Sequence, residues 1–448
     1  MKNSYIYEVI KISWPIIIGQ IGLVLTGFFD SIMVAKLGHE ELAAAGISNS
    51  IFFLLSIFPM GVTMAFASIT GILQGKNKTS SYTILASNSL VVTLLLSFIV
   101  SSILYFTTQC FDLFGQPPEV NTIATPYLNL LNWSLMPLLI FFFAKNICDG
   151  FSYTKGGMIV TLSALGVNVF LNWVLIYGQF GFSAYGVAGA GYATIISRIY
   201  MAVFMLIILF KSSSIPIHTL SFIRSFRTNH RINFYKKIIQ LGLPTGLQYF
   251  FEVAAFAGAA VMAGWLGAKE LAAHQLAITI ASFTYMFAGG IAAGGSICVA
   301  KANGKKNKKD IKNYGKASWQ IGIIIMLFFA GVFLLLSKPL ARLFSDQSDI
   351  IKMGSQLLIW AAIFQLSDGI QAISVALLRG IEDVKKPSAF IFISYWIIAI
   401  PVGYFLSNLA GFSLWWTGIN GIWVGLSIGL TLSALGLSYR FYYLLRKT

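Results

Sequence analysis

The sequence predicts an all-α integral membrane protein with twelve transmembrane helices in two pseudo-symmetric six-helix bundles. Three observations carry this prediction. The chain of 448 residues is 57% hydrophobic and only 10% charged, with a mean hydropathy of +0.78, which is far more apolar than a soluble domain. Its apolar runs are long and continuous rather than alternating, which favours helices over a β-barrel. The second half of the sequence also repeats the first.

Long apolar runs place the spans along the chain, since about 20 apolar residues cross a bilayer as a helix. The first run contains Asp30 and is too long for a cleavable signal, so we interpret it as a span. The predicted spans are 14–37, 45–73, 84–109, 124–147, 158–180, 186–211, 239–265, 274–300, 314–337, 351–378, 387–408 and 416–441.

The repeat appears when the sequence is shifted against itself by 229 residues. This shift superposes Pro15 on Pro244, and the tetrapeptide ELAA at 41–44 on the same tetrapeptide at 270–273. Because each half has an even number of spans, the two halves have the same orientation, as in parallel repeats. We therefore expect three parts: an N-terminal six-helix lobe at 1–211, a cytoplasmic basic linker at 212–237 and a C-terminal six-helix lobe at 238–448.

The net charge of +16 follows the topology instead of indicating a nucleic-acid partner. Most Lys and Arg lie at span ends on one side, and Arg198 lies within a span. This asymmetry predicts that both termini are cytoplasmic. Clusters such as Lys305 and Lys306 are also candidates for contact with anionic membrane lipids. The basic residues at the opposite ends are Lys36, Lys269, Lys338, Arg342 and Lys352.

Three acidic residues carry the functional prediction. Of the fifteen Asp and Glu, only Asp30, Glu252 and Asp368 fall well inside predicted spans. A charge at the bilayer centre costs from about 3 to more than 10 kcal/mol, so such residues usually face a polar cavity and mark an ion or substrate path. Since Arg198 is the only cation predicted at depth, these acids are expected to bind mobile cations or protons.

Polar residues near Asp30 are expected on the fifth and sixth spans. Asn168 and Asn172 are four residues apart, on one helical face, and Thr194 follows on the next span. Their amides and hydroxyl would hold the carboxylate by hydrogen bonds. The same residues would also suit a purely structural role, as polar contacts between helices.

In the second half, Glu252 and Asp368 are expected to form an oxygen-rich site for sodium or protons. The candidate neutral neighbours are Gln275, Ser367 and Gln371, whereas Gln365 is disfavoured by its helical phase. Flat cationic molecules could be held by aromatic and Met side chains. No zinc-protease, esterase or phosphate-binding motif is present in the sequence, so we do not expect an enzyme or a cofactor.

Four segments resemble multidrug and toxic compound extrusion (MATE) transporters of the NorM-like branch. They are GFFDSIMVAKLG in the first span, NVFLNWVLIYG in the fifth, QYFFEVAAFAG with ELAAHQ across the seventh and eighth, and WAAIFQLSDGIQAISVALLRG in the tenth. The resemblance covers essentially the whole chain. It implies a twelve-helix antiporter that exports organic cations in exchange for sodium or protons. By motif, Glu252 and Asp368 would be the cation-site acids, and Asp30 would belong to the polar site of the first lobe.

One residue departs from the pattern of that branch. A tyrosine usually lies four residues before the aspartate of the tenth span, where this chain has Phe364. The phenyl ring keeps a π face but lacks the hydroxyl, which puts in doubt a sodium site of the usual kind.

We therefore expect a monomeric exporter of cationic amphipathic drugs or dyes, in a bacterial inner membrane, that works by alternating access. The main alternative is a lipid-linked oligosaccharide flippase of the wider superfamily. An intramembrane enzyme and a passive channel are further alternatives. The sequence leaves open the natural substrate, the stoichiometry and the choice between sodium and protons.

Overall fold

The computed structural model describes the chain over residues 2–408 and 417–447, with side chains over 4–408 and 417–446. Within this part the regular elements are all helical, and twelve helices are long and apolar enough to cross a membrane. The predicted fold class and number of spans are therefore confirmed. The first residue of the last predicted span, at 416, lies outside the described residues.

Most of the helices are longer than the predicted spans, because a helix continues into water beyond its apolar centre while a hydropathy pattern detects only that centre. In the first half of the chain they are α1 (Lys2–Ala35), α2 (His39–Gly75), α3 (Ser80–Gln109), α4 (Pro118–Gly150), α5 (Lys155–Tyr177) and α6 (Val187–Lys211). In the second half they are α8 (Ile232–Leu266), α9 (Ala268–Gly304), α10 (Lys308–Arg342), α11 (Ser348–Gly380), the segment α12 (Lys385–Phe392), η2 (Ile393–Ala399) and α13 (Ile400–Ser407), and α14 (Ile419–Lys447). A short helical turn, η1 (Phe111–Phe114), lies between α3 and α4.

The chain divides into two compact units. The N-terminal unit is Ile18–Gly246, and the C-terminal unit combines Met1–Ile17 with Leu247–Thr448. Helices α1 and α8 therefore each contribute residues to both units. The division at 1–211, 212–237 and 238–448, drawn from the sequence repeat, stays a prediction.

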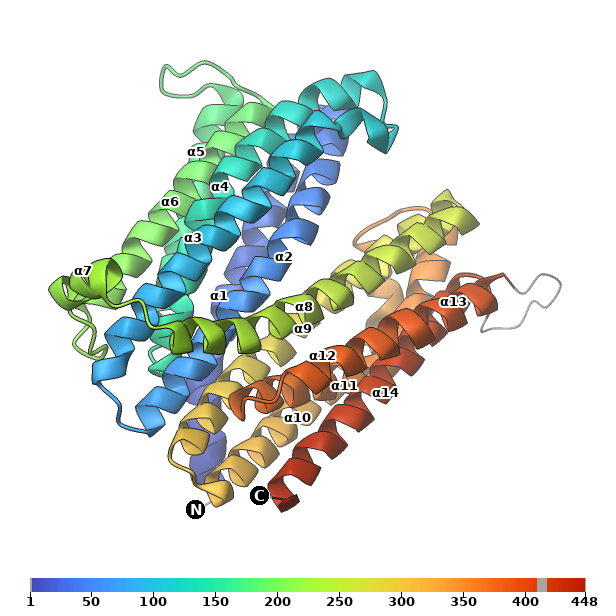
Figure 1. Ribbon diagram of the computed structural model, residues 1–448. Helices are drawn as coiled ribbons and strands as arrows, with labels where there is room; N and C mark the ends of the chain where they lie inside the picture. The colour runs from blue at the N-terminus through green and yellow to red at the C-terminus, as the bar shows by residue number, and fades with distance from the viewer. Residues whose placement is uncertain (1, 409–416, 448) are drawn as a thin grey trace. The chain divides into compact units, whose positions relative to one another are not determined.

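The N-terminal unit is built on close helix packing around α4. This helix packs against α2, α3 and α6, and α5 packs against α6 (Figure 1). Small residues allow the close approach: a Cβ added to Gly150 would lie 2.4 Å from Thr70 Cβ, and one added to Gly189 would lie 2.5 Å from the carbonyl oxygen of Leu175. Glycine at such contacts is typical of membrane helices, where packing rather than hydrophobicity drives association.

The polar segment between the two halves, which the sequence predicts to be a basic linker, includes regular structure. It contains a ten-residue helix, α7 (Thr219–Thr228), that packs against α3 (Figure 1). Phe222 and Ser225 are buried on its inner face, and Ser225 shares a hydrogen bond of 2.9 Å with Ser87. Phe222 and Ser225 are three residues apart, so one helical face is buried and the basic residues lie elsewhere.

The C-terminal unit is centred on α11, which packs against α9, α10 and α14. The segment α12–η2–α13 lies along α14, and its middle part, η2, is a π-helix that ends two residues before Pro401. Two glycines of α14 make this approach close: a Cβ on Gly425 would lie 2.5 Å from the carbonyl oxygen of Ala399, and one on Gly429 would lie 2.8 Å from that of Ser394.

The first turns of α1 belong to the C-terminal unit. Tyr5 donates a hydrogen bond of 2.8 Å to Asp310 on α10, and Tyr314 on α10 donates one to Glu8. The bundle around α11 therefore includes the start of the chain.

Candidate functional site

Asp30 lies on α1 inside the N-terminal unit, half-buried, and is held by the fifth span. The side-chain amide of Asn172 on α5 donates a hydrogen bond to Asp30 Oδ1 and a second, of 3.2 Å, to Asn168 Oδ1. Both asparagines are fully buried. A further hydrogen bond of 2.8 Å, from Tyr177 to the carbonyl oxygen of Met33, ties the same two helices together. The structure thus brings Asp30, Asn168 and Asn172 together.

Three buried polar atoms on α5 and α6 have no hydrogen-bond partner in the described part of the chain. They are Asn168 Nδ2, Asn172 Oδ1 and Thr194 Oγ1. Leaving a buried polar group unpaired costs about 1–3 kcal/mol. These atoms include both donors and acceptors, so they retain hydrogen-bonding capacity. Thr194 is buried on α6, as its predicted place in the network requires, but it makes no hydrogen bond to Asp30.

Arg198 on α6 supplies a fixed positive charge to the same region. Its guanidinium lies over the ring of Phe52, with Cζ 4.6 Å from the centroid, and donates a hydrogen bond to Ser134 Oγ. It also attracts Asp30 electrostatically, although no direct ion pair joins them among the described residues. Asp30 therefore has a fixed positive charge nearby. In this it differs from the two buried acids of the C-terminal unit.

Glu252 on α8 and Asp368 on α11 are both buried in the C-terminal unit, 7% and 8% exposed. They lie close enough to repel each other electrostatically. Among the described residues neither carboxylate forms an ion pair with Lys or Arg. Two buried acids without a fixed counter-charge form a strongly negative site, and such a site favours a bound cation or proton.

Gln371 connects Glu252 to a residue that the sequence did not single out, Tyr395. The Gln371 amide donates a long hydrogen bond, 3.4 Å, to Glu252 Oε1, while its own oxygen accepts one of 3.1 Å from the Tyr395 hydroxyl. Gln371 and Tyr395 are buried. Gln371 therefore offers an N–H group to the carboxylate, whereas the sequence predicted that it would offer an oxygen.

Phe364, the residue that departs from the related branch, is buried in an aromatic cluster. Its ring stacks on Trp423 of α14, with centroids 5.5 Å apart. Trp423 Nε1 in turn donates a hydrogen bond of 3.2 Å to Nδ1 of the buried His274. The ring thus packs one helical turn from Asp368, on the same helix, without offering it a hydroxyl.

The other residues predicted to neighbour Glu252 and Asp368 do not contact them by hydrogen bonds in the described part of the chain. Gln275 is exposed on α9, and Ser367 shares a hydrogen bond of 3.0 Å with Thr431 on α14. Neither makes a hydrogen bond to Glu252 or Asp368 in the described part of the chain. Gln365, disfavoured by its helical phase, is instead buried, and both polar atoms of its side chain lack a hydrogen-bond partner there.

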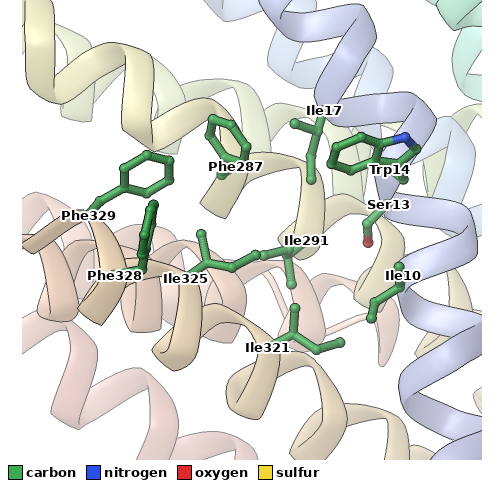
Figure 2. A pocket seen from close by; sticks show the side chains of 10 residues that line it. All are labelled: Ile10, Ser13, Trp14, Ile17, Phe287, Ile291, Ile321, Ile325, Phe328 and Phe329. Carbon is green, nitrogen blue, oxygen red and sulfur yellow. The ribbon is translucent and has the colours of Figure 1, made fainter. Parts of the chain in front are cut away.

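A cavity of about 300 Å³ lies apart from these carboxylates, between α1, α9 and α10 (Figure 2). Aromatic and branched aliphatic side chains form nearly all of its wall, and Ser13 is the one polar residue. Because no acid lines it, this cavity does not provide the cation site. The other lining residues are Ile10, Trp14, Ile17, Phe287, Ile291, Ile321, Ile325, Phe328 and Phe329.

Comparison with known proteins identifies the family of the chain. A family model described as MatE matches it twice, over residues 15–174 and 244–405. The chain belongs to the MatE family. The two matches begin at Pro15 and Pro244, the pair superposed by the sequence repeat, so each half carries one MatE domain. The resemblance inferred from the sequence is therefore confirmed.

Relatives of this MatE chain include the multidrug resistance protein NorM of Vibrio vulnificus (strain YJ016), 30% identical over 98% of this chain and 96% of the relative. The probable multidrug resistance protein NorM of Bacillus subtilis (strain 168) is 30% identical over 97% of this chain and 95% of the relative. Family and relatives are transporters rather than enzymes.

Solved structures show the same fold at lower identity. An outward-facing multidrug resistance MATE family transporter of the MOP superfamily superposes with a TM-score of 0.88 and 21% identity, over 99% of this chain and 97% of that one. A MOP superfamily transporter from Pyrococcus furiosus Vc1 (DSM3638) gives a TM-score of 0.89 and 21% identity, over 99% and 96%.

Proposed function

We propose that this MatE-family transporter is a secondary active antiporter that exports cationic amphipathic drugs or dyes in exchange for sodium or protons. The observation that carries the proposal is the pair of buried acids in the C-terminal unit, Glu252 and Asp368, without a Lys or Arg partner among the described residues. The names of the relatives, multidrug resistance proteins, support the class of cargo.

The two units would contribute different chemistry. Glu252 and Asp368 form the more negative site, which suits a small coupling cation or protons. Asp30, with a resident cation nearby and unpaired amide and hydroxyl groups around it, suits a larger polar or cationic cargo. Competition between ion and drug for negative charge, with alternating access to the two sides of the membrane, would couple the two fluxes without ATP.

The sign of this coupling follows from electrostatics. A sodium ion or proton and a cationic drug are all attracted by negative charge, so in this proposal they compete. Drug and ion therefore weaken each other's binding, and by linkage each does so by the same factor. Mutual exclusion of this kind is what an antiporter requires.

For orientation and location, we propose a monomer in a bacterial inner membrane with both termini in the cytoplasm. The twelve apolar helices support a multi-pass membrane protein. Lys and Arg are concentrated at the ends of the spans that share a side with the termini, including the start of α10, where Lys308 and Lys309 lie. This is the side that the positive-inside rule places in the cytoplasm.

The test uses purified protein in liposomes with a fluorescent cationic dye. A sodium gradient is imposed first, and a proton gradient is imposed in a second preparation. We expect one of the two gradients to drive the dye against its own gradient. Dye movement under neither gradient, from protein that elutes as a single folded species, would contradict antiport and favour a lipid-linked flippase.

A further inference from the structure

The π-helical segment η2 reaches the Glu252 site at two consecutive residues. Tyr395 donates to Gln371, which donates to Glu252. Trp396 Nε1 donates a hydrogen bond of 3.0 Å to the carbonyl oxygen of Phe251, the residue before Glu252. π-Helical turns are rare and are often found at functional sites. Here η2 forms hydrogen bonds both to Gln371, whose side chain contacts Glu252, and to the backbone of Phe251.

Two features fix the π-helical turn in place. Pro401 lies two residues after its end and has no N–H, so the regular helical hydrogen bond from that position is missing. The N–H of Ile400 instead reaches the carbonyl oxygen of Tyr395. On the outer side, Gly429 of α14 allows contact with Ser394, one residue before Tyr395. The backbone that carries Tyr395 is therefore held by this packing and hydrogen bond.

The amide of Gln371 has one orientation that satisfies both neighbours. A carboxylate accepts hydrogen bonds and cannot donate them, whereas a tyrosine hydroxyl can donate. With its N–H toward Glu252 and its oxygen toward Tyr395, Gln371 meets both requirements. The reverse orientation would place the amide oxygen against a carboxylate oxygen, and the two would repel each other.

We propose that Tyr395 is a positioning residue that holds the Gln371 oxygen away from Glu252, and so excludes it from the ligands of a cation bound at Glu252 and Asp368. The inference rests on the proposed function, in which a coupling cation binds at these carboxylates. Sodium is coordinated by oxygen atoms. An amide that presents only N–H contributes none, and the site binds its cation more weakly than its side chains would allow. Weak binding suits a transporter, because a coupling ion has to leave as well as enter.

The direct test is Tyr395→Phe, which removes the hydroxyl and keeps the ring. The Gln371 oxygen then loses its donor, and the amide can turn to share a cation with Glu252. We expect the half-saturating sodium concentration for dye efflux to fall by about 2- to 10-fold, the range set by one net hydrogen bond. The maximal rate should fall as well, because release becomes slower. A merely structural role would lower the rate without moving the half-saturation.

A double-mutant cycle shows whether Tyr395 acts through Gln371. Gln371→Met keeps the volume of the side chain and removes both polar atoms, so adding Tyr395→Phe in that background should have no further effect on sodium affinity. Tyr404→Phe, an exposed tyrosine on α13, is the matched control. Sodium affinity is also measured in detergent from the sodium-dependent shift of the thermal transition, which needs no transport and shows whether each variant is folded.

The outcomes separate this inference from the proposed function. A wild type that moves no dye under any gradient counts against the proposed function, while the thermal shift still reports sodium binding. The inference is supported if Tyr395→Phe alone tightens sodium binding, or acquires sodium binding that the wild type lacks. It is overturned if the affinity is unchanged or weaker, if the same gain appears in the Gln371→Met background, or if no variant responds to sodium.

Discussion

Asn172 on α5 donates a hydrogen bond to the carboxylate of Asp30 on α1, and the same amide donates to Asn168 one turn away. This contact joins the first span to the fifth. It places a negative charge among buried amides that retain unpaired atoms. The carboxylate of Asp30 is thus held by the neutral amide of Asn172, while Arg198 attracts it without a direct ion pair among the described residues.

Replacing Asp30 by Asn should remove the charge at nearly constant volume. We expect cationic dye transport to fall by about tenfold or more, since a loss of 1.4 kcal/mol in binding is already tenfold. Sodium-dependent thermal stabilisation should persist, because the acids of the C-terminal unit are intact. The matched control is Asp112→Asn, an exposed acid between α3 and α4. Full dye transport by folded Asp30→Asn protein would exclude Asp30 from the cargo site.

Replacing Asp368 by Asn should abolish gradient-driven efflux while leaving folded protein in the membrane. The reason is that one of the two charges that attract the coupling ion is lost. Asp349→Asn is the matched control, because Asp349 is an exposed acid at the start of the same helix, α11. Efflux is measured in liposomes containing equal amounts of protein. Normal transport by the Asp368 variant would remove it from the coupling site.

Replacing Glu252 by Gln should abolish coupled efflux or change its ion dependence. The new amide still has an oxygen that can accept from Gln371, so the packing around α8 and α11 should hold. The measurement compares dye efflux under sodium and proton gradients with that of Glu119→Gln, an exposed acid on α4. Unchanged ion dependence together with full activity would show that Glu252 is not part of the site.

Arg198→Met should strengthen the binding of cationic dyes. The guanidinium attracts Asp30 and so competes with any cation that approaches it. Removing this competing charge should lower the half-saturating dye concentration, by about tenfold for each 1.4 kcal/mol of repulsion relieved. Arg227→Met on the exposed side of α7 serves as control. A half-saturation that stays constant or rises would show that Arg198 helps to bind the cargo.

Gly425→Ala should destabilise the C-terminal unit. The added methyl would lie 2.5 Å from the carbonyl oxygen of Ala399 and from the amide nitrogen of Gly403, so α14 would be pushed from the η2–α13 segment. Overpacking of this kind typically costs about 1–3 kcal/mol. Gly331→Ala on α10 meets open space and should be neutral or slightly stabilising. The measurement is the midpoint of thermal unfolding of both variants in detergent.

The sequence predicted the parts of this fold that depend on local properties. Apolar length identified twelve spans, and the cost of burying charge identified Asp30, Glu252 and Asp368 within them. Helical periodicity also placed Asn168 and Asn172 on one face, where they now bond each other. Each of these inferences needs only a residue and its near neighbours in the chain.

The rest depends on packing between distant segments. Tyr395 reaches Gln371 because a π-helical turn and a glycine of α14 shift its register, and no periodicity in a single sequence shows such a shift. The orientation of the Gln371 amide depends on that tyrosine, so the sequence predicted an oxygen where the structure presents N–H. Pro401 was the one signal that regular helix geometry would fail nearby.

The linker shows a related difference. The sequence analysis predicts only a basic linker here, whereas the structure has a helix, α7, that buries Phe222 and Ser225 on one face. Helix α7 is short and has few apolar residues, so amino-acid composition alone does not predict that it packs against another helix.

The central claim is that the flux of a cationic dye is coupled to an opposite ion flux through Glu252 and Asp368. Its most direct test imposes a dye gradient alone on liposomes and records the ion that moves, with radioactive sodium in one experiment and an entrapped pH indicator in another. We predict that dye movement drives one of these ions in the opposite direction in the wild type and not in Asp368→Asn. Dye movement without any opposing ion flux, or ion flux without dye, would contradict antiport.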